Sequence, residues 1–354
     1  MNLLNLLFVV IGLVLVFDFI NGFHDSANSI ATVVSTNVLT PLQAVAFAAF
    51  FNACAGLFFT TKVAAMIGKG IVDPQVINLS VIMAGLIGAI VWNLLTWWWG
   101  LPSSSSHTLV GGLTGAAIVK AGTGVVIFSG IFKILIFIII APVLGMALSF
   151  VISGIVINIC RKMNPSIIDK YFRKLQLISA GAFSLGHGGN DAQKSMGIIW
   201  VALIVTYNDM KSFPARYQHV LIPHWLNYAF LHIDKIPSWA IISCYTAIGF
   251  GTLFGGWRIV KTMGQKITKL KPFEGFCAET AGALTLFGAS SFGIPVSTTH
   301  TITGAIMGVG ARKSVSAVKW GVARNILWAW ILTIPISAAI SALVFYIIKF
   351  YLPV

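Results

Sequence analysis

The sequence predicts an all-α polytopic membrane protein made of two inverted-topology repeats. Hydrophobic residues make up 57% of the 354 residues and charged residues only 9%, and the mean hydropathy is +0.91. Soluble domains carry about 25% charged residues, so nearly all of the apolar surface here must face lipid or other spans. The apolar runs are long enough to cross a bilayer as helices. Two kinds of polar motif also occur once in each half, in the same order, which indicates an internal duplication.

The first kind, motif A, interrupts an otherwise membrane-spanning run at residues 21–28 and again at residues 186–194. Ionisable groups in hydrocarbon are costly, so those in membrane spans usually face a cavity and mark a transport pathway. The glycines predict a break in each helix, because glycine adopts conformations that helices exclude. An Asp191–Lys194 pair that only stabilises packing is the alternative, and the recurrence of the motif disfavours it. Alignment on the aspartates pairs Gly22 with Gly188, Asp25 with Asp191 and Asn28 with Lys194.

The second kind, motif B, lies at residues 102–108 and 295–301, where Gly-Leu-Pro or Gly-Ile-Pro leads into a run of hydroxyl side chains. Gly and Pro stop a helix, and Ser or Thr directly afterwards are favoured N-caps of the next one. A helix start at bilayer depth presents free N–H groups and a positive dipole end, which together bind anions. Two such starts facing each other would bind a tetrahedral oxyanion. The alternative, hydroxyls that only satisfy backbone carbonyls, fits one copy better than two.

The predicted anion ligands are the hydroxyl residues of motif B together with three polar residues of motif A. They are Ser104, Ser105, Ser106, Ser297, Thr298, Thr299, Asn28, Asn190 and Lys194.

The two aspartates of motif A, Asp25 and Asp191, are the predicted ligands of a coupling cation. The protein has only nine acidic residues, and a carboxylate beside an anion repels it unless a cation lies between them. Both aspartates would be metal ligands if the cation is Na⁺, whereas His24 beside Asp25 could carry a proton. Further candidate members of the site are Asp18, His107, His187 and His300, although these histidines could equally be packing residues.

The distribution of basic residues predicts the orientation of the chain in the membrane. Residues 1–160 form the first repeat and residues 175–354 the second, and the basic linker 161–174 is expected in the cytoplasm. A polar insertion at about residues 207–237 is then extracytoplasmic, as are both termini. Equivalent loops differ in basic content, as inverted repeats require. We expect about 10–12 transmembrane segments, with motif B at the turn of either full spans or re-entrant hairpins.

Other classes of protein fit the sequence less well. The net charge of +14 lies mostly in loops, so it indicates orientation rather than nucleic-acid binding. The four cysteines show no paired spacing, and neither a disulfide nor a metal site is expected from them. The first apolar run, from Leu3, is expected to be retained rather than cleaved as a signal peptide. An intramembrane Ser/His hydrolase would need one directional site, whereas these sets are duplicated.

These motifs resemble those of the PiT inorganic phosphate transporters. The family signature Gly-x-Asn-Asp is matched by Gly188 to Asp191 and, with His24 in place of Asn, by Gly22 to Asp25. A motif of the Pro-x-Ser-x-Thr-His style is matched by 102–107, with Ser106 at the Thr position, and by 295–300. The resemblance covers essentially the whole chain. It implies a helical inverted-repeat fold, no enzymatic activity and no cofactor.

The resemblance also implies a function and a location. The chain would import inorganic phosphate, either alone or as a metal–phosphate complex, across the bacterial cytoplasmic membrane as a homodimer. The coupling ion would be H⁺ or Na⁺, and His24 makes this chain similar to bacterial members, several of which are proton-coupled. The family also contains sulfate permeases, so sulfate is the alternative substrate.

Overall fold

A computed structural model describes residues 2–58, 63–64, 70–217, 221–294 and 296–351. Over these residues the fold is helical, with one isolated β-bridge between Val72 and Val126 and no strand. The prediction of an all-α fold is therefore confirmed. The helices are α1 (Leu3–Ser35), α2 (Pro41–Cys54), α4 (Leu79–Trp99), α5 (Ser105–Ala121), α6 (Phe128–Cys160), α7 (Pro165–Ser212), α8 (Pro214–Tyr217), α9 (His224–Leu231), α10 (Ser238–Phe254), α11 (Trp257–Lys261), α12 (Pro272–Ser291), α13 (Thr298–Lys313) and α14 (Trp320–Tyr351).

The described part of the chain contains four helices long and apolar enough to cross a membrane, namely α1, α4, α6 and α14. The pair formed by α10 and residues 257–266 meets the same criteria together and is bent by 62°. Helix α7 is the longest, at 48 residues, but polar residues of motif A lower its hydropathy. A single α-helix of that length extends about 70 Å, well beyond the thickness of a bilayer. The chain is a multi-pass membrane protein.

Each copy of motif B forms a turn between two helices. Gly100 ends α4 in the left-handed conformation with φ 67°, and Gly293 precedes α13 with φ 69°. Glycine is favoured at such positive φ values because it has no Cβ to clash. Pro295, which we included in motif B, lies outside the described residues. Ser104 and Ser297 then cap α5 and α13 through their side-chain oxygens, as the sequence predicts.

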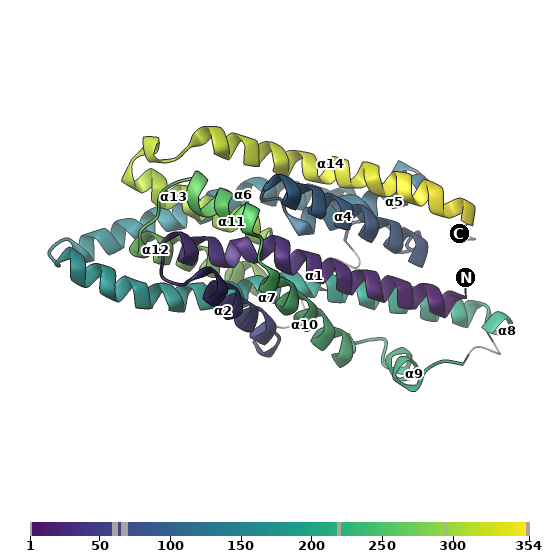
Figure 1. The fold of residues 1–354 in the computed structure, drawn as a ribbon. Coiled ribbons are helices and arrows are strands. Elements are labelled where there is room, and N and C mark those ends of the chain that lie inside the picture. The colour runs from purple at the N-terminus through teal and green to yellow at the C-terminus, as the bar shows by residue number, and fades with distance from the viewer. Residues whose placement is uncertain (1, 59–62, 65–69, 218–220, 295, 352–354) are drawn as a thin grey trace.

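The packing of the helices repeats between the two halves (Figure 1). Helix α5 of the first half packs along α14 of the second, and α13 of the second half packs along α6 of the first. Both contacts are close because glycines face the partner's backbone. A Cβ added to Gly115 would lie 2.1 Å from the carbonyl oxygen of Ala338, and one on Gly304 would lie 2.1 Å from that of Pro142. The α1–α4 contact has its counterpart in α7–α12 in the same way.

The prediction that motif A breaks its helices is wrong. Helix α1 runs unbroken from Leu3 to Ser35, and α7 runs unbroken from Pro165 to Ser212. The glycines instead let neighbouring helices approach. A Cβ on Gly22 would lie 2.3 Å from the carbonyl oxygen of Ile248, and one on Gly188 would lie 2.5 Å from that of Asn52. The small residues therefore serve contact between helices rather than a change of chain direction.

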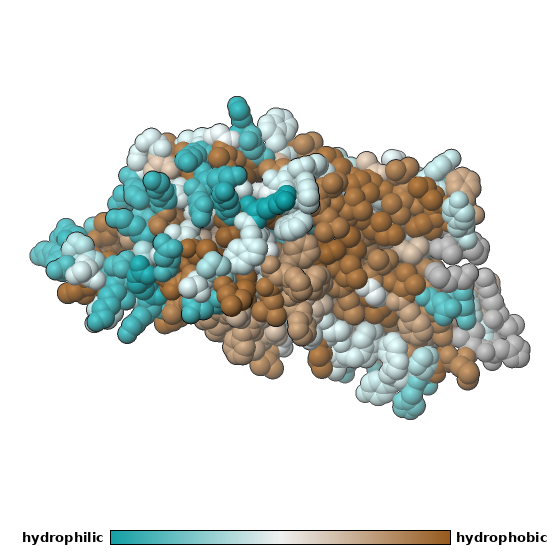
Figure 2. Space-filling model, viewed as in Figure 1, coloured by the Kyte–Doolittle hydropathy of each residue, from teal (hydrophilic) through white to brown (hydrophobic). Residues whose placement is uncertain are grey.

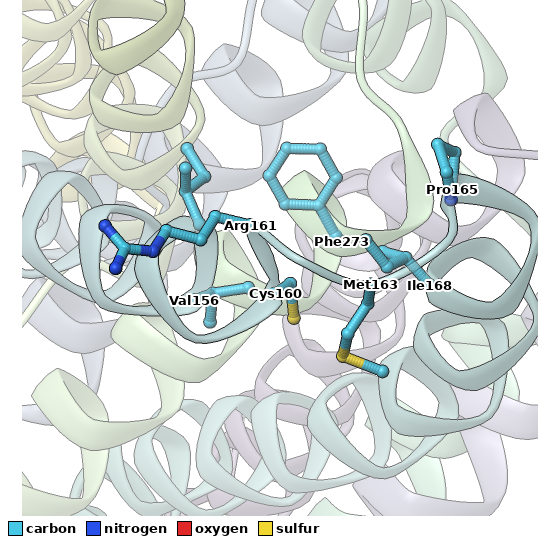
Figure 3. A pocket seen from close by; sticks show the side chains of 8 residues that line it. Val156, Cys160, Arg161, Met163, Pro165, Ile168 and Phe273 are labelled. Atoms are coloured by element: carbon cyan, nitrogen blue, oxygen red, sulfur yellow. The ribbon is translucent and has the colours of Figure 1, made fainter.

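Polar side chains gather at one end of the molecule, whereas a continuous hydrophobic surface lies beside them over α4 and α14 (Figure 2). Figure 1 shows the α6–α7 turn at this polar end and both chain termini at the opposite end. The predicted linker, residues 161–174, consists of that turn and the beginning of α7. A surface cavity of about 250 Å³ lies at the turn and is lined by Cys160, Arg161 and Phe273 among others (Figure 3). None of its lining residues belongs to motif A or motif B.

Candidate anion and cation site

The starts of α5 and α13 meet inside the protein. The backbone N–H of His107 donates to the Ser104 hydroxyl at 3.4 Å, and the N–H of His300 donates to the Ser297 hydroxyl at 3.2 Å. The rings of the two histidines lie in contact, with centroids 4.8 Å apart. The first N–H groups of a helix have no partner within it, and the helix dipole adds positive potential there. Two buried helix starts therefore point their donors into one region.

Asp25 of α1 lies beside the start of α5. Its Oδ1 is 2.6 Å from His24 Nδ1, and its Oδ2 accepts a hydrogen bond of 3.3 Å from the Ser105 hydroxyl. The other ring nitrogen of His24 lies 3.1 Å from the hydroxyl oxygen of Thr96, which also accepts from the Ser103 hydroxyl at 2.8 Å. The imidazole is thus held on both sides. All of these side chains are buried.

Asp191 of α7 has the corresponding place beside the start of α13. Lys194 donates to Oδ1 at 2.6 Å, and the Thr298 hydroxyl donates to Oδ2 at 3.3 Å. His187 Nε2 lies 3.4 Å from Oδ2, close enough for an ion pair if the ring is protonated but without hydrogen-bond geometry. His187 is positioned by Asn52, whose Oδ1 is 3.2 Å from Nδ1. Asp191 therefore has a lysine where Asp25 has a histidine.

Two contacts cross between the halves at equivalent positions. The Asn28 amide donates to the Thr299 hydroxyl at 2.9 Å and to the Thr298 hydroxyl at 3.3 Å. Its aligned counterpart, Lys194, donates to the hydroxyl of Ser106 and to the carbonyl oxygen of Val296 at 3.2 Å. Ser106 and Thr299 are themselves aligned in motif B. Motif A of each half is therefore bonded to motif B of the other half.

Three side chains could hold a cation within this arrangement. One ligand atom each from Asp25, His187 and Asp191 can be chosen so that all lie within 4.8 Å of one another. Carboxylate oxygens suit Na⁺ and Mg²⁺, whereas an imidazole ligand favours a transition metal. Two carboxylates this close in a buried site also repel, so a bound cation or proton would stabilise the pair.

The remaining predicted residues lie at different distances from this centre. Asn190 is fully buried, and within the described residues neither atom of its amide group has a hydrogen-bond partner. His300 stacks on Trp330, with ring centroids 3.9 Å apart, which fits the packing alternative. Asp18 contacts neither helix start, and it accepts a hydrogen bond from Ser195 instead.

The sequence reasoning did not single out Glu279, one of two buried glutamates of α12. Glu279 of α12 is inaccessible to solvent and accepts hydrogen bonds from Thr32 at 2.5 Å, Ser179 at 2.5 Å and Gln176 at 3.1 Å. An acid within an apolar run is itself a signal of a buried polar site, so the sequence held the clue. The supporting residues Thr96 and Asn52 carried no such signal.

Comparison with known proteins bears on this arrangement. The model of the phosphate transporter family matches residues 21–341. A Rhizobium meliloti protein named probable low-affinity inorganic phosphate transporter is 52% identical over 341 residues, covering 96% of each chain. A Bacillus subtilis protein of the same name is 43% identical, covering 98% of each. A solved structure described as the sodium-dependent phosphate transporter superimposes with a TM-score of 0.81 at 26% identity, covering 98% of this chain and 100% of that one. The chain belongs to the phosphate transporter family, whose members are transporters rather than enzymes.

Proposed function

We propose that this chain imports inorganic phosphate across the cytoplasmic membrane by secondary transport, with the anion bound between the starts of α5 and α13. The observation that carries the proposal is the crosswise bonding of the two motifs, in which Asn28 reaches Thr299 and Lys194 reaches Ser106. Donors from both halves converge on one place, and a tetrahedral oxyanion needs many donors. The names of the bacterial relatives support phosphate as that oxyanion.

The proposed ligands divide by the kind of donor they supply. The hydroxyls of motif B and the free N–H groups beside them supply neutral donors at the positive ends of two helices. Lys194 supplies the one full positive charge among the proposed anion ligands, and hydrogen bonds to charged groups are about twice as strong as neutral ones. Asn28 and Asn190 supply amide groups. The neutral ligands are Ser104, Ser105, Ser106, Ser297, Thr298, Thr299, Asn28 and Asn190.

The proposed coupling ion is a proton carried by the His24–Asp25 pair. Lys194 donates to Asp191 at 2.6 Å, whereas the group at that distance from Asp25 is an imidazole, the side-chain type that proteins most often use to carry protons. A proton on this pair offsets negative charge next to the bound anion, as a metal ion would. Its release on the cytoplasmic side would then weaken phosphate binding there.

Sodium is the second candidate, supported by the sodium dependence of the solved relative and by the nearness of Asp25 and Asp191. Phosphate that enters with a divalent metal is a variant of the same idea, because His187 adds a ligand type that Na⁺ does not favour. We further propose that residues 161–174 lie in the cytoplasm and residues 207–237 and both termini outside. The basic residues of the linker support the cytoplasmic side for the polar end that Figure 2 shows. A homodimer is also part of the proposal.

Uptake of labelled phosphate into proteoliposomes tests these proposals, with proton, sodium and magnesium gradients imposed one at a time. We expect concentrative uptake with an inward proton gradient in the absence of sodium. Uptake that depends on the sodium gradient and not on the pH gradient would show that the coupling ion is sodium rather than the proton. Stronger competition by sulfate than by unlabelled phosphate would contradict phosphate as the substrate.

A further inference from the structure

A buried carboxyl outside the candidate site has an unusual environment. Asp18 of α1 is completely inaccessible to solvent and accepts a hydrogen bond from the hydroxyl of Ser195 on α7. Its other oxygen, Oδ2, has no conventional hydrogen-bond partner within the described residues. The thiol of Cys244 on α10 also faces this carboxyl, but S–H is a weak donor.

The other buried acids are satisfied in ways that Asp18 is not. Asp25 and Asp191 each have a basic side chain at 2.6 Å, and Glu279 accepts three hydrogen bonds. The groups that face Asp18 are Ser195 and, farther off, Asp191 of α7, with Cys244 and Tyr245 of α10. None of these side chains is a cation. Burial of a carboxylate without a cation and with few donors is costly, so the environment suits a carboxylic acid better than its anion.

The position of Asp18 connects it to the candidate site. The buried residues Asp18, Asn21 and Asp25 are spaced three and four apart and therefore share one face of α1. Asp191 and Ser195 are four apart and share a face of α7, which packs against α1. The Asp18–Ser195 contact is thus the next polar contact along the α1–α7 interface, about two helical turns nearer to the start of α1 than Asp25. Figure 1 shows the start of α1 at the end of the molecule where both termini lie.

We propose that Asp18 is a proton-carrying group of the transport cycle, separate from the cation ligands. In the proposed step its carboxylate accepts a proton that enters from the side of the chain termini and becomes a neutral carboxylic acid. Release of that proton to the other side restores the carboxylate, with no other bond made or broken. Ser195 holds the carboxyl in place through both states. The proposal rests on phosphate transport coupled to protons, as proposed above.

Three substitutions separate proton carriage from a structural role. Asp18→Asn keeps the shape but cannot release a proton, Asp18→Glu keeps a carboxyl, and Ser195→Ala removes only the hydroxyl. Each variant is reconstituted for two measurements: exchange of labelled for unlabelled phosphate without gradients, and phosphate accumulation under a pH gradient. A pH-sensitive dye inside the vesicles gives the number of protons that enter with each phosphate.

Under a gradient of one pH unit, each proton carried supports about tenfold accumulation of phosphate. We expect Asp18→Asn to retain exchange, to lose about tenfold in accumulation and to carry fewer protons per phosphate. Asp18→Glu should retain part of the accumulation. Ser195→Ala should retain exchange and change the pH at which accumulation is half-maximal, which keeps the proposal testable if Asp18→Asn does not fold.

Several results would overturn the proposal. One is an Asp18→Asn protein with the accumulation and proton ratio of the wild type. Another is the parallel loss of exchange and accumulation in both Asp18 variants, which would indicate a structural role. An unchanged pH profile in Ser195→Ala would also count against it. By contrast, a wild-type protein that exchanges no phosphate would refute the proposed function, and one driven by sodium alone would refute proton coupling.

Discussion

The two copies of motif A lie in similar surroundings but balance their charge differently. Asp25 and Asp191 each accept a 3.3 Å hydrogen bond from the aligned hydroxyl of motif B, Ser105 in one case and Thr298 in the other. The basic partner of Asp25 is the adjacent His24, whereas that of Asp191 is Lys194, three residues later. The polar framework is therefore nearly symmetric, and the charges are not. The basic group at 2.6 Å is thus an imidazole at Asp25 and a lysine at Asp191, where the ring of His187 lies farther off, at 3.4 Å.

The largest effect is expected when either of the two carboxylates is replaced. Asp25→Asn and Asp191→Asn should each abolish gradient-driven phosphate uptake while the protein remains folded and inserted. An amide in place of the carboxylate cannot hold a cation or release a proton, so the coupling ion loses its ligand while the shape of the side chain is kept. Asp169→Asn is the matched control, because Asp169 pairs with Arg173 at an exposed position. Near-wild-type uptake by either site variant would show that the substituted aspartate does not bind the coupling cation.

The next largest effect is expected when the amino group of Lys194 is removed. Lys194→Gln should weaken phosphate binding roughly 10- to 100-fold, because loss of a charged hydrogen bond costs about 1.5–3 kcal/mol. Isothermal titration of the purified protein with phosphate measures the change. Lys313→Gln provides the control, since Lys313 pairs with Glu274 from a partly exposed position. Equal affinity in Lys194→Gln and wild type would mean that Lys194 only neutralises Asp191.

A smaller effect is expected for the aligned hydroxyls of motif B, and their substitution tests the symmetry of the site. Ser105→Ala and Thr298→Ala should each weaken phosphate binding by about 1–3 kcal/mol, because a buried anion loses a donor. The two losses should be similar, since the residues are aligned and make equivalent hydrogen bonds. Thr298→Val keeps the shape of the side chain and controls for packing. A large loss from one substitution and none from the other would argue against a shared, symmetric site.

The smallest change in binding is expected at His24. His24→Asn should leave phosphate affinity nearly unchanged, because His24 contacts Asp25, Thr96 and Ser103, none of which is a proposed phosphate ligand. The substitution should nevertheless reduce the response to a pH gradient, to the part that the proposed proton carrier Asp18 supports, and introduce a response to sodium. Uptake under separate gradients measures both, with His232→Asn at an exposed position as control. An unaltered response to the pH gradient would show that His24 does not take part in proton coupling.

The helical fold and the residues that meet near Asp25 and Asp191 could be predicted from the sequence. That α1 and α7 run unbroken through motif A could not. The scarcity of acids pointed to Asp25 and Asp191, and the repeated hydroxyl runs pointed to two helix starts. Glycine in motif A was interpreted as a helix breaker, although the same lack of a Cβ also permits close helix packing. Tertiary contacts decide between these outcomes, and Gly188 against the Asn52 carbonyl is one that no local pattern reveals.

Supporting residues were harder to predict than ligands. Asn52 and Thr96 are polar residues of apolar helices that lie outside both motifs, and such residues commonly bond to nearby backbone carbonyls. Their contacts with His187 and His24 depend on helices distant in the sequence. Glu279 could have been singled out by the rule that selected the aspartates, but no second copy drew attention to it.

The glycine contacts between the halves constrain how the protein can move. Gly111 and Gly115 seat α5 against the backbone of α14, and Gly304 and Gly308 seat α13 against that of α6. Separation of α5 from α14, or of α13 from α6, would break a closely packed helix interface. Each of these two pairs is therefore expected to move as one rigid body. Each body then contains a helix from both halves of the sequence. The boundary between such bodies would therefore not follow the boundary between the two halves of the sequence.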